Sequence, residues 1–229
     1  MLRQMVFLVG GRGTRLGALT SDTPKPLLAV AGRPFLDILI ESSLGQGFDH
    51  ILLLAGFCGE QIEAYAAGWR NRGADVKCIV EREAAGTAGA LHHARDRLDE
   101  TFILANGDSF FGIDLRALAE AGSGQAWNAR LALRAHADAG RYGAIQTSGE
   151  RITAFREKAA SGAGLINAGI YLLHRAILDA VPPPPSSLEQ DVFPEQAAQG
   201  LVYGKVFEGP FIDIGVPEDL QRAQTLFAR

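Results

Sequence analysis

The stretch LVGGRGTRL, residues 8–16, places three closely spaced glycines directly after an apolar run. Backbone N–H groups in such a turn can point at a negatively charged ligand, and a turn after a buried strand is a common phosphate site. Arg12 and Arg15 bring positive charge to the same turn. The stretch therefore predicts a strand that ends in an anion-binding turn, within a fold that alternates strands and helices.

The spacing of the glycines separates this turn from two other phosphate-binding turns. A P-loop requires Lys after its last glycine, whereas Gly13 is followed by Thr14. A dinucleotide-binding turn requires glycine at the third position of GxGxxG, and Leu16 stands there, with Gly17 one residue late. A plain strand-to-helix turn stays open on the glycines alone.

A second basic segment, TPKPLL at residues 23–28, follows shortly after the turn. Lys25 stands between Pro24 and Pro26, which restrict the backbone on each side of it. This bracket presents a flexible cation at one place, which a lysine needed only for solubility would not require. A glycine turn, an arginine and a fixed lysine together predict a site for several phosphates.

Strand-like and helix-like segments alternate in the first half of the chain. Apolar runs rich in Val, Ile and Leu predict buried strands at residues 4–9, 50–55, 76–80 and 101–105. Helical spacing predicts helices at residues 34–44, 60–69 and 88–98. This alternation predicts an α/β fold with a Rossmann-like, mostly parallel central sheet and helices on both faces. Ligands of such sheets gather at the carboxyl ends of the strands.

The second half has little helix between its strand-like segments. Strands are predicted at residues 129–135, 142–146, 152–157, 168–173, 202–207 and 211–214. We expect them to form a small mixed or antiparallel extension. Ser186, with Glu189 three residues later, predicts a capping box for a short helix, and Pro217 predicts the start of a final helix ending at residue 227. No boundary resembles a flexible linker, so we expect a single domain over residues 1–229.

The composition limits the class of partner. The 229 residues carry a formal net charge of −4 and are 47% hydrophobic, which is ordinary for a soluble globular protein and excludes a general affinity for nucleic acid or anionic membrane. The apolar run at residues 5–9 is too short for a signal peptide or a membrane span. Cys58 and Cys78 form no CxxC pair and indicate two buried thiols in a reducing compartment. We expect a cytoplasmic protein.

GGRGTRL followed by TPKPLL resembles the opening signature of the sugar-1-phosphate nucleotidyltransferases. The similarity continues at intervals across nearly the whole chain. The resemblance implies a fold of the nucleotide-diphospho-sugar transferase type. It also implies that residues 1–125 form the mainly nucleotide-binding half, and residues 126–229 the mainly sugar-phosphate-binding half with a sugar-binding extension.

The resemblance implies a set of nucleotide-binding residues. Arg15 would contact the β and γ phosphates and Lys25 the α phosphate. The segment EAAGTAGA, residues 83–90, resembles the family's E-P-L-G-T-A-G-A, whose glycine lies against the base, although Ala84 and Ala85 replace Pro and Leu. The assigned residues are Gly10, Gly11, Arg12, Gly13, Thr14, Arg15, Lys25, Gly86 and Thr87.

Two aspartates are implied ligands of a Mg²⁺ cofactor. Asp108 ends the segment NGD at residues 106–108, which by itself is equally compatible with a plain turn. Asp213 lies in FIDIGVPE, residues 211–218, which resembles the family's W-x-D-I-G-T-P-E. Mg²⁺ prefers oxygen ligands and usually takes one or two carboxylates together with substrate phosphates. The implied catalytic residues are Arg15, Lys25, Asp108 and Asp213.

Three further segments imply the sugar-phosphate site. Residues 142–143 resemble a Y-G segment whose glycine contacts the sugar, and residues 167–171 match N-x-G-x-Y. Residues 155–159 resemble F-x-E-K-P, with Ala159 in place of proline, so that Glu157 would bind sugar hydroxyls and Lys158 the sugar's phosphate. The implied substrate-binding residues are Asn106, Gly143, Glu157, Lys158 and Asn167.

The implied reaction joins a nucleoside triphosphate and a sugar 1-phosphate to give a nucleoside diphosphate sugar and pyrophosphate, without a covalent enzyme intermediate. Residues 187–194 (SLEQDVFP) and 211–224 (FIDIGVPEDLQRAQ) look most like heptose 1-phosphate guanylyltransferases. These use GTP to make GDP-D-glycero-α-D-manno-heptose for bacterial surface polysaccharides.

Other functions stay open. They are mannose-1-phosphate guanylyltransferase, a short UTP- or dTTP-dependent enzyme for hexose or amino-sugar 1-phosphates, and a non-catalytic sugar-nucleotide-binding regulatory subunit. A regulatory subunit would be expected to lose Lys25, Asp108 or Asp213, and all three are present. A dinucleotide-dependent oxidoreductase is disfavoured by Leu16. We expect no β-helix acyltransferase extension, and a homo-oligomer is compatible with the resemblance although no apolar stripe identifies an interface.

Overall fold

The computed structural model describes residues 2–139, 143–156 and 162–228. It divides into two compact units, each assembled from segments far apart in the sequence. The first unit comprises Met1–Ala84, Ala105–Phe111 and Pro210–Arg229, and the second comprises Ala85–Leu104 and Gly112–Gly209. Each unit is described by itself below.

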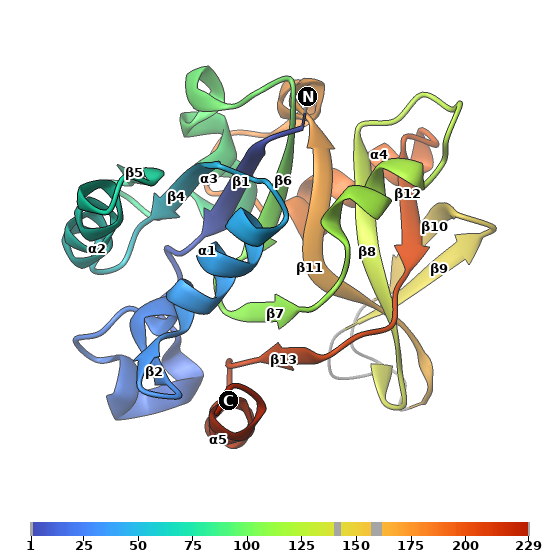
Figure 1. Cartoon of the computed structure of the whole chain (residues 1–229). Helices are drawn as coiled ribbons and strands as arrows, with labels where there is room; N and C mark the ends of the chain where they lie inside the picture. The colour runs from blue at the N-terminus through green and yellow to red at the C-terminus, as the bar shows by residue number, and fades with distance from the viewer. Residues whose placement is uncertain (1, 140–142, 157–161, 229) are drawn as a thin grey trace. The chain divides into compact units, whose positions relative to one another are not determined.

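The first unit contains the glycine turn and most of the predicted parallel strands (Figure 1). Its strands and helices are β1 (Gln4–Leu8), β2 (Ala29–Val30), β3 (Arg33–Pro34), α1 (Phe35–Gly45), β4 (His50–Ala55), α2 (Gly59–Asn71), β5 (Asp75–Val80), β7 (Ser109–Phe111), β13 (Phe211–Asp213) and α5 (Pro217–Leu226). Two 3₁₀ segments, Thr14–Thr20 and Lys25–Leu27, complete it.

The strand β4 lies between β1 and β5, and all three run parallel. The apolar run at residues 50–55 forms β4, five of whose six residues are buried. Continuous burial is typical of a parallel strand covered on both faces, and α2 packs against β4 and β5. Because the strands are parallel, their carboxyl ends lie at one edge, where the glycine turn begins.

A short antiparallel ribbon joins two distant parts of the first unit. The strands β7 and β13 pair so that Asp213 lies opposite Ser109. The ring of Phe227 at the end of α5 makes edge contacts with Phe110, at 5.1 Å between ring centroids, and with Phe35, at 6.3 Å. These apolar contacts hold the C-terminal segment against residues 105–111.

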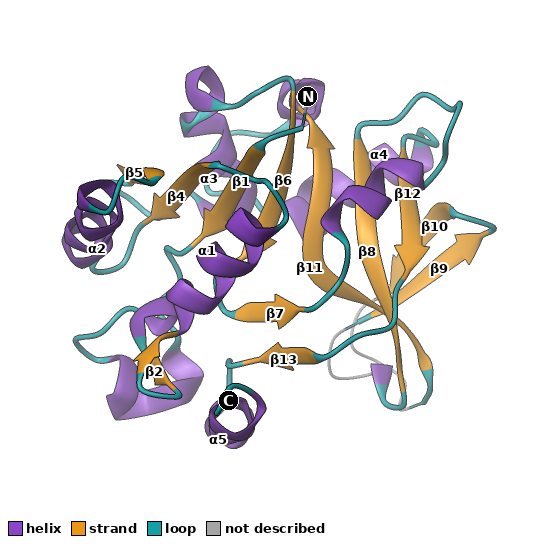
Figure 2. Cartoon of the chain, in the orientation of Figure 1, coloured by secondary structure: helices purple, strands orange, loops and turns teal. Residues whose placement is uncertain are grey.

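The second unit consists mostly of strands (Figure 2). Its strands and helices are α3 (Gly86–His93), β6 (Thr101–Asn106, whose last two residues belong to the first unit), β8 (Ala129–His136), β9 (Ala144–Ser148), β10 (Arg151–Arg156), β11 (Gly164–His174), α4 (Phe193–Ala198) and β12 (Val202–Val206). Its 3₁₀ segments are Arg95–Arg97, Leu115–Glu120 and Arg175–Ala180, and Leu188–Val192 forms a π-helical turn.

The strand order in the second unit is β6-β11-β8-β12-β10-β9. The strand β8 runs antiparallel to β11 and parallel to β12, whereas β10 is antiparallel to both β12 and β9. The helix α4 packs against β10 and β12. The α/β class with a parallel sheet and a mixed extension is therefore confirmed.

Some predicted elements differ from the structure. The helix predicted at residues 88–98 begins earlier, at Gly86, and ends at His93, because Ala94 leaves helical dihedral angles before a separate 3₁₀ turn. The predicted capping box is displaced by one residue. The side chain of Ser187, not Ser186, accepts from the N–H of Gln190, since Ser186 is buried against α3.

The predicted strand at residues 142–146 is found as β9, which begins at Ala144, and Tyr142 lies outside the described residues. No helix among the residues that the structure describes is long and apolar enough to cross a bilayer.

Candidate active site

The glycine turn follows the carboxyl end of β1 as predicted. Glycine is required at two of its positions, for different structural reasons. A Cβ atom on Gly10 would lie 2.9 Å from the backbone nitrogen of Gly56, so glycine is required by close approach to the end of β4. Gly13 has a φ of +63°, which L side chains rarely adopt. Around Gly11 there is open space. The turn is therefore fixed at Gly10 and Gly13 and open between them.

The basic side chains of the turn face different surroundings. Arg12, Thr14 and Arg15 are exposed, as is Gly11. The guanidinium of Arg12 lies over the ring of Phe57, at 5.8 Å from its centroid. Exposed amides and cations at the carboxyl edge of a parallel sheet are available to an anionic ligand.

Lys25 is buried and points at an acid. Only 8% of the residue is exposed, and its Nζ lies 2.7 Å from Oδ2 of Asp108. The flanking prolines begin a 3₁₀ turn in which the N–H of Leu28 donates to the carbonyl of Lys25. A Cβ atom on Gly13 would lie 3.1 Å from Cε of Lys25, so the lysine stem runs along the glycine turn. The predicted proximity of turn and lysine is present within the first unit.

The two aspartates predicted to share a metal ion lie on the paired ribbon. Asp108 precedes β7 and Asp213 ends β13, and the N–H of Ile214 donates to the carbonyl of Asp108 at 2.9 Å. Gly107 lets residue 108 reach this place, since a Cβ there would lie 2.6 Å from the Val9 side chain. The structure thus brings together two acids that are more than a hundred residues apart.

The electrostatics of this acid pair favour a bound cation. Burial raises the pKa of the Asp213 carboxyl, and the neighbouring charge of Asp108 raises it further. The N–H of Gly215 and the charges of Lys25 and Arg15 oppose that rise in the pKa. A divalent cation would relieve the repulsion between the two acids.

The donor set fits Mg²⁺ better than a metal held wholly by protein. Among the described residues no group of three or more His, Cys, Asp or Glu side chains could hold a metal ion. Two carboxylates match the number that Mg²⁺ takes when substrate phosphates and water complete its coordination.

Gly215 lies beside Asp213 and Arg15, although the sequence did not assign it to the site. Its N–H donates to Oδ1 of Asp213 at 2.7 Å. A Cβ atom there would lie 2.7 Å from Nη2 of Arg15 and 2.8 Å from Asp213 Oδ1. Glycine at this position therefore lets the guanidinium of Arg15 approach the acid. The segment DIG contained the signal, because a glycine two residues after a carboxylate commonly forms such a turn.

In the second unit, Gly86 and Thr87 begin α3 and are held by the chain itself. Gly86 has a φ of +77°, and a Cβ there would lie 2.2 Å from the carbonyl oxygen of Ser186. The hydroxyl of Thr87 accepts from the N–H of Leu188 at 2.8 Å and donates to Glu189 at 3.0 Å. The glycine is therefore required by packing, whatever it contacts in a ligand.

Asn167 lies at an irregularity in β11, where the register with β8 shifts between residues 167 and 171. Its Oδ1 accepts from the N–H of Gly169 at 2.9 Å, and its Nδ2 donates to the hydroxyl of Tyr171 at 2.9 Å. Gly169 has a φ of +74°. Bulges are frequent beside active sites, where they redirect a side chain.

The remaining predicted sugar-site residues are only partly described. Asn106 ends β6, directly before Gly107 and Asp108. Gly143 has a φ of +85°, and its N–H donates to the carbonyl of Ala139. Glu157 and Lys158 lie outside the described residues.

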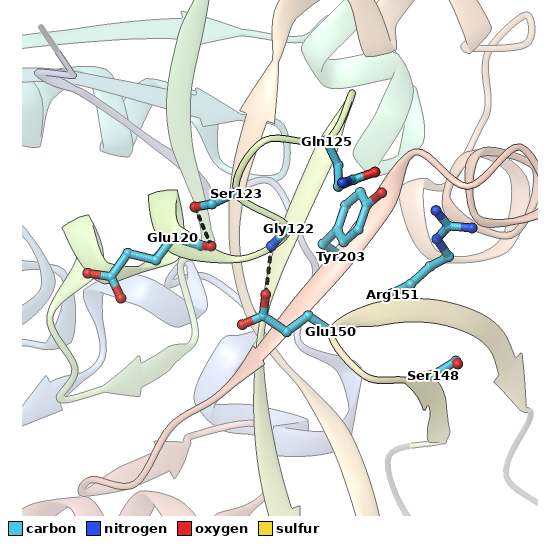
Figure 3. A pocket seen from close by; sticks show the side chains of 8 residues that line it. All are labelled: Glu120, Gly122, Ser123, Gln125, Ser148, Glu150, Arg151 and Tyr203. Carbon is cyan, nitrogen blue, oxygen red and sulfur yellow. Dashed lines mark hydrogen bonds between the residues drawn. The ribbon is translucent and has the colours of Figure 1, made fainter.

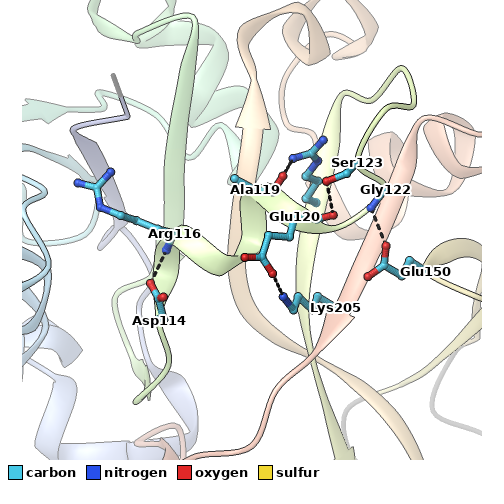
Figure 4. Close-up of polar contacts among 9 residues, drawn as sticks. Asp114, Arg116, Ala119, Glu120, Gly122, Ser123, Glu150 and Lys205 are labelled. Atoms are coloured by element: carbon cyan, nitrogen blue, oxygen red, sulfur yellow. Dashed lines mark hydrogen bonds and ion pairs between the residues drawn. The ribbon is translucent and has the colours of Figure 1, made fainter.

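A separate pocket of about 550 Å³ lies in the second unit (Figure 3). Of the predicted site residues that the structure describes, none lines it. Its acids are engaged: Glu120 pairs with Lys205, and Glu150 accepts from the N–H of Gly122 at 2.9 Å (Figure 4). These contacts join β12 and the β9–β10 connection to the segment before β8. They serve the fold.

Residues 4–229 match the family described as Nucleotidyl transferase. With a buried lysine, two convergent carboxylates and a glycine turn at the end of a parallel strand, the chain belongs to this family of transferases.

The chain is similar in sequence and in structure to several known proteins. The chain is 35% identical to D-glycero-alpha-D-manno-heptose 1-phosphate guanylyltransferase of Aneurinibacillus thermoaerophilus, covering 96% of each protein. It is 33% identical to mannose-1-phosphate guanylyltransferase of Mycobacterium tuberculosis, over 98% of this chain but 64% of that one. The crystal structure of HddC from Yersinia pseudotuberculosis complexed with GMP-PN has a TM-score of 0.86 and 31% identity, covering 99% of this chain and 100% of that one.

Proposed function

We propose that this protein transfers a guanylyl group from GTP to D-glycero-α-D-manno-heptose 1-phosphate, giving GDP-heptose and pyrophosphate. The observation that carries the reaction class is the cluster of Lys25, Asp108 and Asp213 beside the glycine turn of the first unit. The choice of GTP and heptose is supported by the relatives that match nearly end to end under that name.

The reaction needs no general base. A phosphate oxygen of the sugar 1-phosphate is already ionised at neutral pH and attacks the α-phosphorus of the triphosphate in line. The bond from the α-phosphorus to the bridging oxygen breaks, and that oxygen leaves as part of pyrophosphate. The barrier comes from bringing two polyanions together and from charge that accumulates on the leaving group, so catalysis consists of positioning and electrostatic stabilisation.

The residues of the first unit have distinct parts in this proposal. The backbone amides of residues 10–13 hold the triphosphate, and the guanidinium of Arg15 stabilises its leaving portion. Lys25, fixed by its neighbouring prolines, stabilises the α-phosphate. Asp108 and Asp213 would hold Mg²⁺, which when bound offsets phosphate charge and orients the α-phosphate.

In the second unit, we assign Gly86 and Thr87 to the nucleotide and Asn167 and Gly143 to the sugar. Glu157 and Lys158 keep the roles expected from the sequence, and Asn106 is assigned to the substrate as well. The proposed enzyme depends on Mg²⁺, which Asp108 and Asp213 would hold, and we assign its sugar-nucleotide synthesis to the cytoplasm.

The deciding experiment is pyrophosphate release from a matrix of substrates. GTP, ATP, CTP, UTP and dTTP are each combined with heptose, mannose, glucose and N-acetylglucosamine 1-phosphates, with Mg²⁺ or with EDTA. We expect pyrophosphate release from the combination of GTP and heptose 1-phosphate, in Mg²⁺ and not in EDTA. Mass spectrometry should identify GDP-heptose as the other product. The Asp108→Asn protein is the matched control for contaminating activity.

A second candidate is mannose-1-phosphate guanylyltransferase, favoured by the 33% identity over 98% of the chain with such an enzyme. Faster turnover with mannose 1-phosphate than with heptose 1-phosphate would establish it. Release with UTP or dTTP would contradict both guanylyl transfers. If no combination released pyrophosphate and the protein still bound nucleotide, the result would favour a non-catalytic regulatory subunit over an enzyme.

A further inference from the structure

Residues 186–192 of the second unit clamp the start of α3. The carbonyl of Ser186 accepts from the N–H groups of Ala88, at 3.0 Å, and Gly89, at 3.4 Å. The N–H of Ser186 donates to the carbonyl of Ala85 at 2.8 Å. The first turn of α3, which carries Gly86 and Thr87, is therefore held by the segment that contains Glu189.

The carboxylate of Glu189 joins this loop to β11. One oxygen, Oε2, accepts from the hydroxyls of Thr87 and Ser187, each at 3.0 Å. The other oxygen, Oε1, accepts from the hydroxyl of Tyr171 at 3.0 Å, and that hydroxyl accepts from Nδ2 of Asn167 at 2.9 Å. A continuous hydrogen-bonded chain thus runs from Thr87 through Glu189 and Tyr171 to Asn167.

An ionised carboxylate can only accept hydrogen bonds, so it fixes the direction of every bond in this chain. Both Thr87 and Tyr171 must donate toward Glu189. The hydroxyl oxygen of Tyr171 is then available to Asn167, whose amide orientation is set in turn. Tyr171 has 0% of its surface exposed, and its ring packs on Phe193 at 5.1 Å between centroids. The chain of bonds is therefore anchored in the core of the second unit.

We propose that Glu189 is a positioning residue that couples the two substrate subsites, holding Thr87 for the nucleotide and Asn167, through Tyr171, for the sugar. The coupling rests on the proposed function, because the assignments of Thr87 and Asn167 belong to it. A substrate that shifts Thr87 or Asn167 shifts the bonds to Glu189 as well, so binding at one end changes the free energy of binding at the other. Thermodynamic linkage requires the effect to be equal in both directions.

The substitution Glu189→Gln tests the direction of the bonds while it keeps the shape of the side chain. Its amide nitrogen donates, so it opposes either Thr87 or Tyr171, and both hydroxyls can no longer donate to the same residue. Glu195→Gln, an exposed position on α4, is the matched control for loss of one charge.

The measurement is the dissociation constant of heptose 1-phosphate, with and without saturating α,β-methylene GTP, by calorimetry. We expect the wild-type protein and Glu195→Gln to bind the sugar phosphate at least about fivefold more tightly with the analogue, and Glu189→Gln to bind it equally in both cases. Steady-state kinetics should show a raised KM for both substrates in Glu189→Gln, which a purely structural loss of folded protein would not produce.

Tyr171→Phe is the second variant, because it keeps the ring packing and removes only the sugar side of the chain. We expect it to raise the KM for the sugar phosphate while the dissociation constant of the GTP analogue stays unchanged, even if Glu189→Gln folds poorly.

The outcomes separate the two proposals. Coupling that survives in Glu189→Gln, or a wild-type protein that binds both ligands independently, overturns the role of Glu189 and leaves the proposed function intact. Binding of neither ligand by the wild-type protein overturns both.

Discussion

The two units carry polar clusters of opposite character. In the first unit, Asp108 and Asp213 repel each other and are held together by the pairing of β7 with β13. In the second unit, Glu189 accepts three hydrogen bonds from hydroxyls and is fully engaged by the protein. A cation between the two acids would relieve the repulsion in the first cluster, whereas the carboxylate of Glu189 in the second is already stabilised by hydroxyl donors of the protein. A buried pair of neighbouring acids therefore marks the proposed reaction centre, and a carboxylate held by hydroxyl donors marks a residue that positions its neighbours.

The largest expected effect on activity comes from removing a charged side chain from the cluster of the first unit. Lys25→Met and Asp108→Asn should each lower kcat/KM for pyrophosphate release by about 10²–10³-fold or more, because Lys25 supplies positive charge to the α-phosphate and Asp108 would hold the Mg²⁺ that does the same. The matched controls are Lys77→Met and Asp75→Asn, which break an exposed ion pair of 3.4 Å on β5. Near-wild-type turnover in either Lys25→Met or Asp108→Asn would contradict the assignment.

Next comes the backbone clamp of the second unit. Gly86→Ala should lower the free energy of unfolding by about 2 kcal/mol or more, since the new methyl group meets the Ser186 carbonyl at 2.2 Å and the φ is positive. Urea titration measures the change. Gly11→Ala is the control, because open space surrounds that position and its stability should be unchanged. Equal stability of the two variants would show that residues 186–192 move freely.

Gly215→Ala sharpens the comparison within the first unit. The methyl group would displace the flexible end of Arg15 and press on Asp213, so the fold should survive and activity should suffer. We expect kcat to fall about tenfold, with the melting temperature unchanged. This is a smaller fall than the about 10²–10³-fold typical when a stabilising group is removed outright, because Arg15 is displaced and not lost. A fall in melting temperature without loss of kcat would assign Gly215 to the fold alone.

Asp213→Asn should separate stability from catalysis. The folded pKa of Asp213 is raised above its ordinary value of 3.8, so the folded state binds the proton more tightly than the unfolded state. The wild-type protein therefore loses stability as the pH rises from below 3.8 through the raised pKa, and the Asn variant does not. At pH 7 we expect the variant to be more stable than the wild-type protein in EDTA, and inactive in Mg²⁺. Equal stability of the two proteins at every pH would show that Asp213 is not repelled.

The smallest effect concerns Ser186, whose hydroxyl oxygen is buried without a hydrogen-bond partner in the described structure. Ser186→Ala should leave activity unchanged and raise the melting temperature slightly, because an unsatisfied buried hydroxyl is removed while the backbone clamp stays. A loss of stability would show that this hydroxyl has a partner.

Long elements with strong patterns were predictable from the sequence. The strand at residues 50–55 was placed to the residue, because an unbroken apolar run must be buried on both faces. The strand predicted at residues 211–214 is found as β13, whereas its partner β7 was not predicted, because three residues directly after a turn carry too little local pattern and the pairing with β13 defines the strand. The prediction that Ser186 forms a capping box was wrong, because Ser186 is buried against α3, a contact distant in the sequence that outweighs its preference for capping a helix.

For the site, the resemblance supplied Lys25, Asp108 and Asp213, and the structure brings them together. It did not supply Glu189 or Gly215, since their importance comes from neighbours distant in the sequence. Thr87 lies 102 residues before Glu189, and Arg15 is brought to Gly215 only by the fold.

The ion pair between Lys25 and Asp108 has a consequence for the binding of Mg²⁺. The ammonium group of Lys25 already pairs with Asp108, and the charges of Lys25 and Arg15 also act on Asp213. A divalent ion that binds between the two acids therefore competes with the ammonium group of Lys25 for Asp108. The negative charge of a bound triphosphate would add to the attraction of Asp108 and Asp213 for Mg²⁺, so these residues would hold the ion more tightly when nucleotide is present.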